Sequence, residues 1–331
     1  MSRSRMLTFA SVGTFALGAA VAVGALVTSS ARDAVGPLPA AGLLLPADAA
    51  FLVGIDVKRL TSSALYRKQA AAHAALRPEA FKELEESTGL DLERDVERVL
   101  LAGSKTRRGV ALAFGQFDEY KLSRAIEARP GVAADKVAGI TLYAFAANAA
   151  GGARGVAFLD KGTILLGDLA QVRETLEAHG QGRTPLQSNA MLLKLLSRVP
   201  PGSTFWMVSD PTLLANLPAT LLSPGGSGAS LTLPALQSLV VTGEVEPLVS
   251  LQLTGEAADE AAARNLADLV RGLVAILGMQ ASQKPEWKEL SSALSVTQNA
   301  SQVLVNFRIA PEALERLAAK SAPGGASPAQ P

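Results

Sequence analysis

Short apolar runs alternate with longer amphipathic stretches along most of the chain, and this alternation predicts an α+β fold. The run 50–56 is typical of a buried strand, and the stretch 57–76 after it is typical of a helix. The turn Asp160-Lys161-Gly162 between two later runs predicts a tight hairpin. In this first part, strands are expected at 50–56, 98–103, 109–117, 141–146, 155–159 and 163–166, and helices at 57–76, 79–87, 118–128, 168–180 and 189–199.

A similar order of elements starts again near Thr204. Landmarks such as Asp56 and Asp210 recur at offsets of 154, 140 and 142 residues, and a nearly constant offset is typical of an internal duplication. Coincidence in a long α+β chain is the alternative, since identity between the copies is low. We predict two similar lobes, 46–200 and 201–320, each an antiparallel or mixed sheet with helices packed on one face. In the second lobe, strands are expected at 204–210, 239–243, 248–253, 294–297 and 303–309, and helices at 211–222, 257–279 and 311–319.

The N-terminal stretch Met6–Val27 carries no charge over 22 residues, and Arg3 and Arg5 precede it. This length is enough for a helix to cross a bilayer, which favours a signal anchor. The segment is also rich in Gly and Ala and is followed by small residues up to Ala31, which favours a signal peptide cleaved after Ala31. Residues 1–31 are therefore a signal peptide or a signal anchor. In both cases the two arginines predict export of the rest of the chain, across the inner membrane.

Two low-complexity stretches flank the predicted body. Residues 32–45 are expected to form a Pro/Gly/Ala linker, and residues 321–331 a disordered tail. Within the second lobe, residues 223–230 are expected to form a flexible surface loop.

Composition limits the partners and the chemistry. The 331 residues are 48% hydrophobic and carry a net charge of +1, which argues against a nucleic-acid partner because such proteins need a basic surface. The chain has no cysteine. Disulfides, a thiolate nucleophile and a lipid-modified cysteine are therefore excluded.

The search for reactive groups yields no catalytic, cofactor-binding or metal-binding residue to nominate. His73 and His179 each lack an orienting partner at helix spacing, which favours a structural role for both. Asp91, Glu93 and Asp95 lie close together in sequence, but a calcium loop needs more oxygen ligands and a turn glycine. We therefore expect helix capping there. No cofactor is predicted.

The predicted helix 257–279 is the most apolar element after the N-terminal stretch. Leu266, Leu269, Leu273 and Val274 fall on one broad stripe, while charged residues lie off it. Interruption by charge favours a core helix over a membrane-bound or lipid-binding one.

Short motifs carry one family resemblance. Leu45-Pro46-Ala47-Asp48-Ala49 leads into the strand 51–56, and Thr88-Gly89-Leu90-Asp91-Leu92 leads into Asp95-Val96. Together with the membrane segment and the two lobes, these motifs resemble uncharacterised bacterial envelope proteins known only as domains of unknown function. The resemblance implies no catalytic residue. The cysteine-free linker departs from lipoproteins of similar architecture.

Three functions are consistent with these observations. The first is a non-catalytic exported envelope protein that binds or scaffolds a partner, attached to the membrane through residues 6–27 if these are not cleaved. The second is a carrier or chaperone that holds an apolar ligand in a cleft between the lobes. The third, an enzyme of unrecognised type, has the least support because no catalytic constellation is found.

Overall fold

The computed structural model describes residues 37–72, 90–104, 108–147, 152–211, 236–280, 285–314 and 316. Several predicted features lie outside these ranges, namely the N-terminal segment 6–27, the helix 79–87, the helix 211–222 after its first residue, the loop 223–230 and the tail 321–331. Within the described ranges, no helix is long and apolar enough to cross a membrane.

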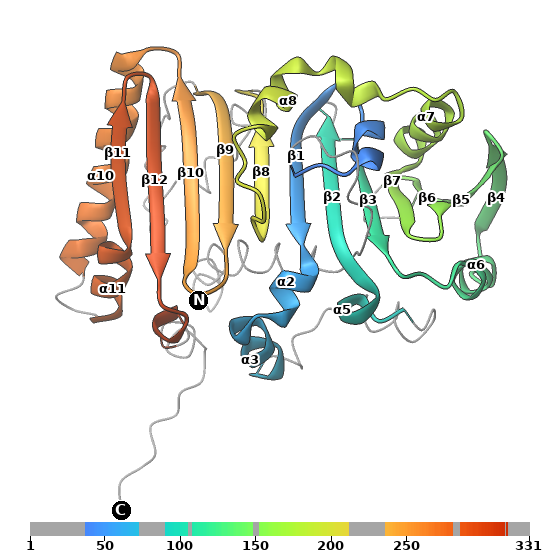
Figure 1. The fold of residues 1–331 in the computed structure, drawn as a ribbon, viewed down its shortest axis with the longest axis horizontal. Coiled ribbons are helices and arrows are strands. Elements are labelled where there is room, and N and C mark those ends of the chain that lie inside the picture. Colours follow the sequence, from blue (N-terminus) through green and yellow to red (C-terminus); the bar gives the residue numbers. More distant parts are fainter. Residues whose placement is uncertain are drawn as a thin grey trace, which may run out of the picture. The chain divides into compact units, whose positions relative to one another are not determined.

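Twelve strands form one antiparallel sheet in the order β11-β12-β10-β9-β8-β1-β2-β3-β7-β6-β5-β4 (Figure 1). The strands are β1 (Ala49–Asp56), β2 (Val96–Ser104), β3 (Gly109–Gly115), β4 (Val132–Val137), β5 (Ile140–Phe145), β6 (Arg154–Asp160), β7 (Thr163–Asp168), β8 (Phe205–Ser209), β9 (Leu236–Glu244), β10 (Val249–Ala257), β11 (Leu294–Asn299) and β12 (Gln302–Ile309). The helices are η1 (Ala40–Leu44), α2 (Val57–Ser62), α3 (Ala64–Ala72), α5 (Leu92–Asp95), α6 (Glu119–Glu127), α7 (Leu169–Gly180), η3 (Pro185–Ser188), α8 (Ala190–Leu196), α10 (Glu260–Gln280) and α11 (Pro285–Ala293).

The α+β class and the strands expected from apolar runs are confirmed, but the arrangement in two separate sheets is wrong. The runs 50–56 and 204–210, interpreted as equivalent strands of two lobes, correspond to β1 and β8. These two strands pair with each other, with Phe51 opposite Ser209 and Ile55 opposite Phe205. The structure does not show the predicted duplication.

By its internal contacts the chain divides into two compact units. Of the described residues, the first unit comprises those up to 211 together with 238–242, and the second comprises 236–237 and those from 243 onward. Strands β1–β8 belong to the first unit and β10–β12 to the second, while β9 contributes its central residues to the first. Each unit is described below by itself.

Side-chain caps determine where several helices of the first unit begin. Asp56 Oδ1 accepts a hydrogen bond from the Arg59 amide at 2.9 Å and starts α2 directly after β1. Asp168 caps α7 in the same way, by accepting from the Gln171 amide at 3.2 Å. The Gln171 side chain does not return a hydrogen bond to the N-cap amide, since its Oε1 has no partner among the described residues, while its Nε2 donates to Glu174 Oε2 at 3.2 Å.

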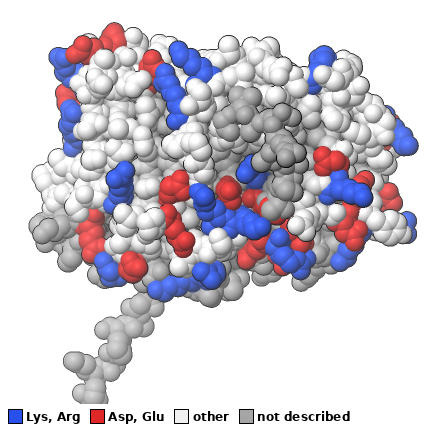
Figure 2. All heavy atoms as spheres, viewed as in Figure 1, with Lys and Arg blue, Asp and Glu red and all other residues white. Residues whose placement is uncertain are grey.

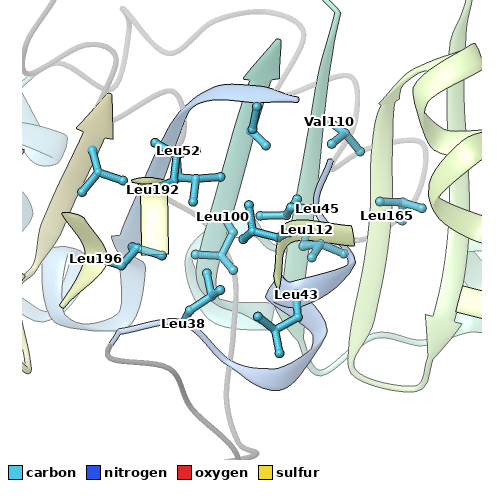
Figure 3. Packing of buried hydrophobic residues seen from close by; sticks show 14 of the residues in the cluster. Leu38, Leu43, Leu45, Leu52, Leu100, Val110, Leu112, Leu165, Leu192 and Leu196 are labelled. Atoms are coloured by element: carbon cyan, nitrogen blue, oxygen red, sulfur yellow. The ribbon is translucent and has the colours of Figure 1, made fainter. Parts of the chain in front are cut away.

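The main core of the first unit lies between its central strands and the helices η1, η3, α7 and α8 (Figure 3). Leu52, Leu100 and Leu112 extend from three adjacent strands, β1, β2 and β3, and each is fully buried. Leu192 and Leu196 of α8 lie over them. Burial of each such side chain contributes about 1.5–3 kcal/mol.

The predicted linker 32–45 is part of this core where the structure describes it, from residue 37 onward. Residues 40–44 form the short helix η1, and Leu38 and Leu45 on either side of it are both fully buried. The linker interpretation is therefore wrong for this stretch. Burial of the leucine side chains stabilises the folded stretch by more free energy than ordering its backbone costs. The stretch therefore folds although prolines and glycines favour a loop.

Helices cover both faces of the sheet in the first unit, not one face as predicted. Successive residues of a strand point to opposite faces, and β3 shows this clearly. Leu112 joins the core beneath α7 and α8, whereas its neighbour Ala113 joins a second cluster that includes Leu122 of α6. Tyr143 and Phe158 complete the second cluster with an edge-to-face ring contact at 6.4 Å between centroids.

The second unit is a three-stranded segment, β10, β12 and β11, with the helices α10 and α11 packed on it. Ala263, Leu266 and Ala267 of α10 pack against Ala257 and Val303 in a core that is smaller than that of the first unit. These contacts come from the N-terminal half of α10. They agree with the core-helix interpretation of 257–279 for that half.

Candidate functional site

Charged side chains of the first unit concentrate where β1 ends and β2 begins. Asp56, the last residue of β1, lies opposite Arg98 of β2 in the strand register. Helix α2 follows β1, and the four-residue helix α5 precedes β2. The two strand ends and the two short helices thus gather the charges into one cluster, here called the strand-end cluster.

Glu97 is the most buried carboxylate of the strand-end cluster. Its side chain is only 9% exposed, and its Oε1 lies 3.7 Å from Lys58 Nζ. Burial raises the pKa of Glu97 above its ordinary value of 4.5, and the negative charge of Asp56 adds to the increase, while Lys58 and Arg98 oppose it. A carboxylate with a raised pKa is a feature of acid/base sites, but ion-pair networks produce it as well.

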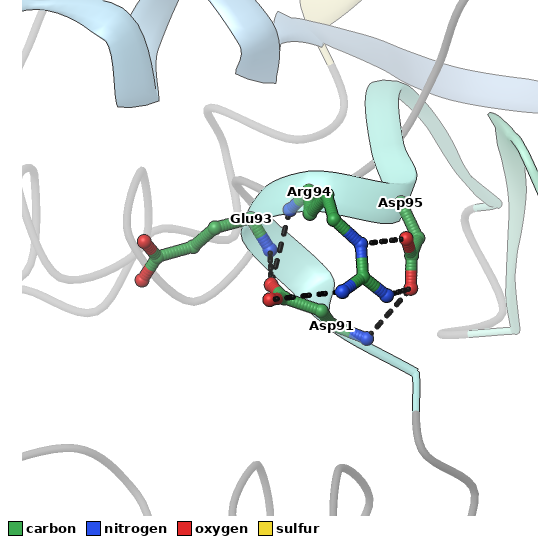
Figure 4. Close-up of polar contacts among 4 residues, drawn as sticks. All are labelled: Asp91, Glu93, Arg94 and Asp95. Carbon is green, nitrogen blue, oxygen red and sulfur yellow. Dashed lines mark hydrogen bonds and ion pairs between the residues drawn. The ribbon is translucent and has the colours of Figure 1, made fainter.

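Arg94 lies between two aspartates at α5 (Figure 4). Its Nε and Nη2 donate to Asp95 Oδ1 and Oδ2 at 2.6 and 2.9 Å, a two-bond pairing that raises the pKa of Arg94. Asp91 Oδ1 accepts from the amides of Glu93 and Arg94, each at 3.0 Å. The Asp91 amide donates to Asp95 Oδ2 at 2.8 Å and closes the ring of contacts.

Glu93 points away from this ring and links α5 to a different helix. Its Oε1 accepts from the Tyr66 hydroxyl of α3 at 3.0 Å. Further along, the Asp95 carbonyl accepts from the Gln116 amide just after β3, at 2.9 Å. The strand-end cluster therefore connects α3, α5 and the end of β3.

The hydrogen bonds and ion pairs of the strand-end cluster support a structural role better than a catalytic one. Asp91 is the N-cap of α5, as predicted, and its oxygens face amide donors and a guanidinium rather than an open space. Within the described ranges, no group of three or more Asp, Glu or His side chains is arranged to hold a metal ion. The strand-end cluster holds short helices on the sheet, and its carboxylates already have donors.

Replacing Asp91 by alanine should lower the free energy of unfolding by about 1 kcal/mol, the usual cost of losing a side-chain N-cap. Urea denaturation of the full chain measures the change. Asp91→Asn keeps the acceptor oxygen and is the control, expected close to the wild type. If calcium chloride raised the melting temperature of the wild type but not of Asp91→Ala, the capping interpretation would be wrong and a cation site would be indicated.

The raised pKa of Glu97 predicts a pH-dependent contribution to stability. The folded state holds the Glu97 proton more tightly than the unfolded chain does, so this contribution is present below the ordinary pKa and is lost as pH rises through the raised folded-state value. Glu97→Gln should therefore gain stability relative to the wild type as the pH rises above 4.5, the ordinary pKa of the carboxyl group. Denaturation at several pH values measures the trend, with Glu119→Gln at an exposed side chain as control. A trend of opposite sign would show that the Lys58 pairing outweighs burial.

The other residues singled out from sequence have structural positions or lie outside the described ranges. His73 is outside them, and His179 lies in the last turn of α7. Sequence reasoning missed the Arg94–Asp95 pairing and the burial of Glu97.

One buried polar atom of the first unit lacks a hydrogen bond among the described residues, the Oε1 of Gln171. The other polar atom of the Gln171 side chain, Nε2, donates to Glu174 Oε2. The second oxygen of Glu174, Oε1, lies 3.3 Å from Arg108 Nη1. A single unpaired acceptor does not define a ligand site, because a buried water satisfies such an atom equally well.

Charges of both signs are mixed over the face of the molecule drawn in Figure 2. The drawn face therefore shows no large patch of one sign among the described residues.

Comparison with known proteins gives a likeness in structure only. No family model matches the sequence, and no curated protein matches it. A solved structure of TP0453 in crystal form I is similar with a TM-score of 0.48 and 12% identity, over 88% of this chain and 98% of the other. Crystal form IV of TP0453 is similar with a TM-score of 0.44 and 11% identity, over 83% and 95% of the two chains. Neither comparison assigns a role to a residue of this chain.

Proposed function

We propose that the chain is a non-catalytic, exported envelope protein that binds a partner through its second unit. Export is supported by the uncharged stretch 6–27 with Arg3 and Arg5 before it. A non-catalytic role is supported by the contacts that the charged side chains of the described residues make. In the strand-end cluster the carboxylates cap helices or pair with cations, so they are engaged in the fold.

The observation that carries the binding proposal is the apolar side of α10. Its N-terminal half packs on the sheet, but Leu269 and Leu273 are half-buried and Ile276 is 44% exposed. Together these three side chains form what is called here the α10 shoulder. An apolar helix side that the fold covers only in part, with one side chain exposed, favours an interaction surface, because water is expelled from it when a partner binds.

A carrier function is the second candidate, and the same side chains favour it. An apolar ligand, such as a long-chain hydrocarbon, gains about 0.8 kcal/mol per buried CH₂ group. A protein partner and a carried ligand make different predictions at the α10 shoulder. A protein partner forms a covalent adduct of higher mass with a cross-linker placed there, whereas a small ligand does not.

A photo-reactive amino acid at position 276 of the full chain, expressed in its host, tests the proposal. We expect irradiation to give a protein adduct of defined mass with the reactive group at Ile276. The same group at Tyr120, an exposed aromatic of the first unit, is the control and should give no such adduct. Absence of any protein adduct at position 276 would overturn the binding proposal, and a small-molecule adduct there would favour the carrier. Protease treatment of spheroplasts tests export separately.

A further inference from the structure

Among the described residues, strand β11 ends the strand order and so has one side without a neighbouring strand. Its sequence, Leu294–Asn299, contains no charged residue and no proline. Val296 and Thr297 are β-branched and favour the extended backbone. An edge of this kind presents unpaired amide and carbonyl groups and pairs readily with another strand.

The strand at the other end of the order, β4, is protected in a way that β11 is not. Asp135 and Lys136 lie on it and are both exposed. Asp135 Oδ2 also pairs with Arg173 Nη2 of α7 at 2.8 Å, and this ion pair holds the Asp135 carboxylate at the edge strand. Charges on an edge strand oppose pairing with another sheet because they would have to be desolvated. Of the two edge strands among the described residues, β11 is therefore the one whose composition does not oppose pairing.

The α10 shoulder points past the open edge. Among the strands of the second unit, α10 contacts β11 most extensively, whereas α11 contacts β12 more extensively than β11. Gly278 marks the side of α10 that faces α11, since a Cβ there would lie 4.0 Å from Ser291 Oγ. At 100° per residue, Leu273 and Ile276 fall on the opposite side of the helix from Gly278. The shoulder therefore faces away from α11 and beyond β11.

We infer that β11 and the α10 shoulder together bind a second copy of this chain about a two-fold axis. This inference rests on the proposed binding function and names its partner. The two β11 strands pair antiparallel, with Val296 opposite Val296 of the second copy and Leu294 opposite Gln298, so that equivalent faces of the strands match. The axis is perpendicular to the sheet. Both α10 helices therefore lie on the same side and bring their shoulders together.

A second copy fits this surface better than an extended peptide does. A peptide supplies a strand but nothing to cover Leu269, Leu273 and Ile276, and strand pairing over six residues is marginal by itself. A second copy supplies both elements at once, because an isologous interface repeats every feature. Self-pairing of β11 brings no like charges together, since the strand carries none.

The natural absence of cysteine allows a direct test in the full chain. A single cysteine at Val296→Cys is placed at the proposed axis, and Ala134→Cys on the other edge strand, β4, is the matched control. Treatment of isolated membranes and supernatant with a short bis-maleimide should convert most of the Val296→Cys chain to a species of twice its mass. Less than a tenth of the Ala134→Cys chain should convert.

A second pair of variants tests the α10 shoulder without a cross-linker. Ile276→Glu should weaken self-association at least tenfold, because two carboxylates would meet across the axis. Ala275→Glu is the matched control, since Ala275 is also exposed but points about 100° away around the helix. Sedimentation of the purified full chain in detergent measures the association.

The outcomes separate this inference from the proposed function. A monomer at all concentrations, with no doubling at Val296→Cys, overturns the second copy as partner. If a photo-reactive group at position 276 then still labels a different protein, the binding function stands with another partner. If it labels nothing, both fail. A dimer that cross-links equally at Ala134→Cys also overturns the inference, because the wrong edge would be involved.

Discussion

Truncating Leu45 to alanine should lower the free energy of unfolding by about 2–5 kcal/mol. Leu45 follows η1, is fully buried and lies in the main core with Leu52 and Leu100. Removing three carbons from such a side chain loses their burial and leaves a cavity that the surrounding helices fill only in part. Urea unfolding of the full chain, followed by far-ultraviolet circular dichroism, measures the loss.

The control for Leu45 is the same truncation at Leu166 of β7, whose side chain is 36% exposed. Leu166→Ala should cost less than about 1 kcal/mol, since less apolar surface returns to water. An equally small cost for Leu45→Ala would mean that the stretch 37–45 behaves as the linker that its composition suggests. The comparison therefore separates the two interpretations of this stretch directly.

Much of the fold could be predicted because buried strands have a strong local pattern. The apolar runs at 98–103 and 303–309 correspond to β2 and β12, with boundaries shifted by two residues or fewer. Strand β4 was missed because Ala133, Asp135 and Lys136 are exposed there and form no apolar run. Its pairing with β5 makes it a strand, and local sequence does not encode pairing between distant segments.

Helix boundaries show the same limit. The helix predicted over 57–76 is divided into α2 and α3 at Ser63. The Ser63 hydroxyl donates to the Leu60 carbonyl at 2.7 Å and accepts from the Tyr66 amide at 3.1 Å, so one side chain ends a helix and starts the next. A serine within an otherwise helical pattern was the available signal, but serine is common in helices as well.

At the candidate site, contacts between neighbours in the sequence could be predicted, whereas contacts between residues far apart in the sequence could not. Capping by Asp91 depends only on residues that follow it closely in the sequence, and the structure confirms this prediction. The Tyr66–Glu93 hydrogen bond joins residues 27 positions apart and depends on how α3 and α5 fold onto the strands. The open edge at β11 depends on the order of the strands in the sheet. That order was not predicted, because the spacing along the chain led us to place the strands in two separate sheets.

Adding a single methyl group at Gly54 should destabilise the first unit by about 3 kcal/mol, at the upper end of overpacking effects. Gly54 of β1 lies opposite Trp206 of β8, and the indole ring lies over the glycine backbone. A Cβ at Gly54 would overlap ring carbons of Trp206, and the ring is 4% exposed, so it has little room to move. We expect Gly54→Ala to shift the urea midpoint of Trp206 fluorescence downward, measured in a Trp287→Phe background that leaves one tryptophan.

Gly109→Ala on β3, a strand of the same sheet separated from β1 by β2, is the matched control. The nearest atom to a Cβ there is the Ala102 carbonyl oxygen at 3.6 Å, an ordinary contact, so we expect a change of less than about 1 kcal/mol. If both substitutions cost the same, the effect comes from strand backbone preferences and not from the tryptophan.

A double-mutant cycle then identifies the tryptophan ring as the cause. Trp206→Leu alone should cost several kcal/mol, because it empties a large buried volume. In the Trp206→Leu background, Gly54→Ala should cost far less than it does alone, since the overlapping ring is gone. The two changes are therefore expected to be non-additive by at least about 1–2 kcal/mol, which is within the range for residues in contact. Additive costs would show that Gly54 is required for a reason other than close packing of β8 on β1.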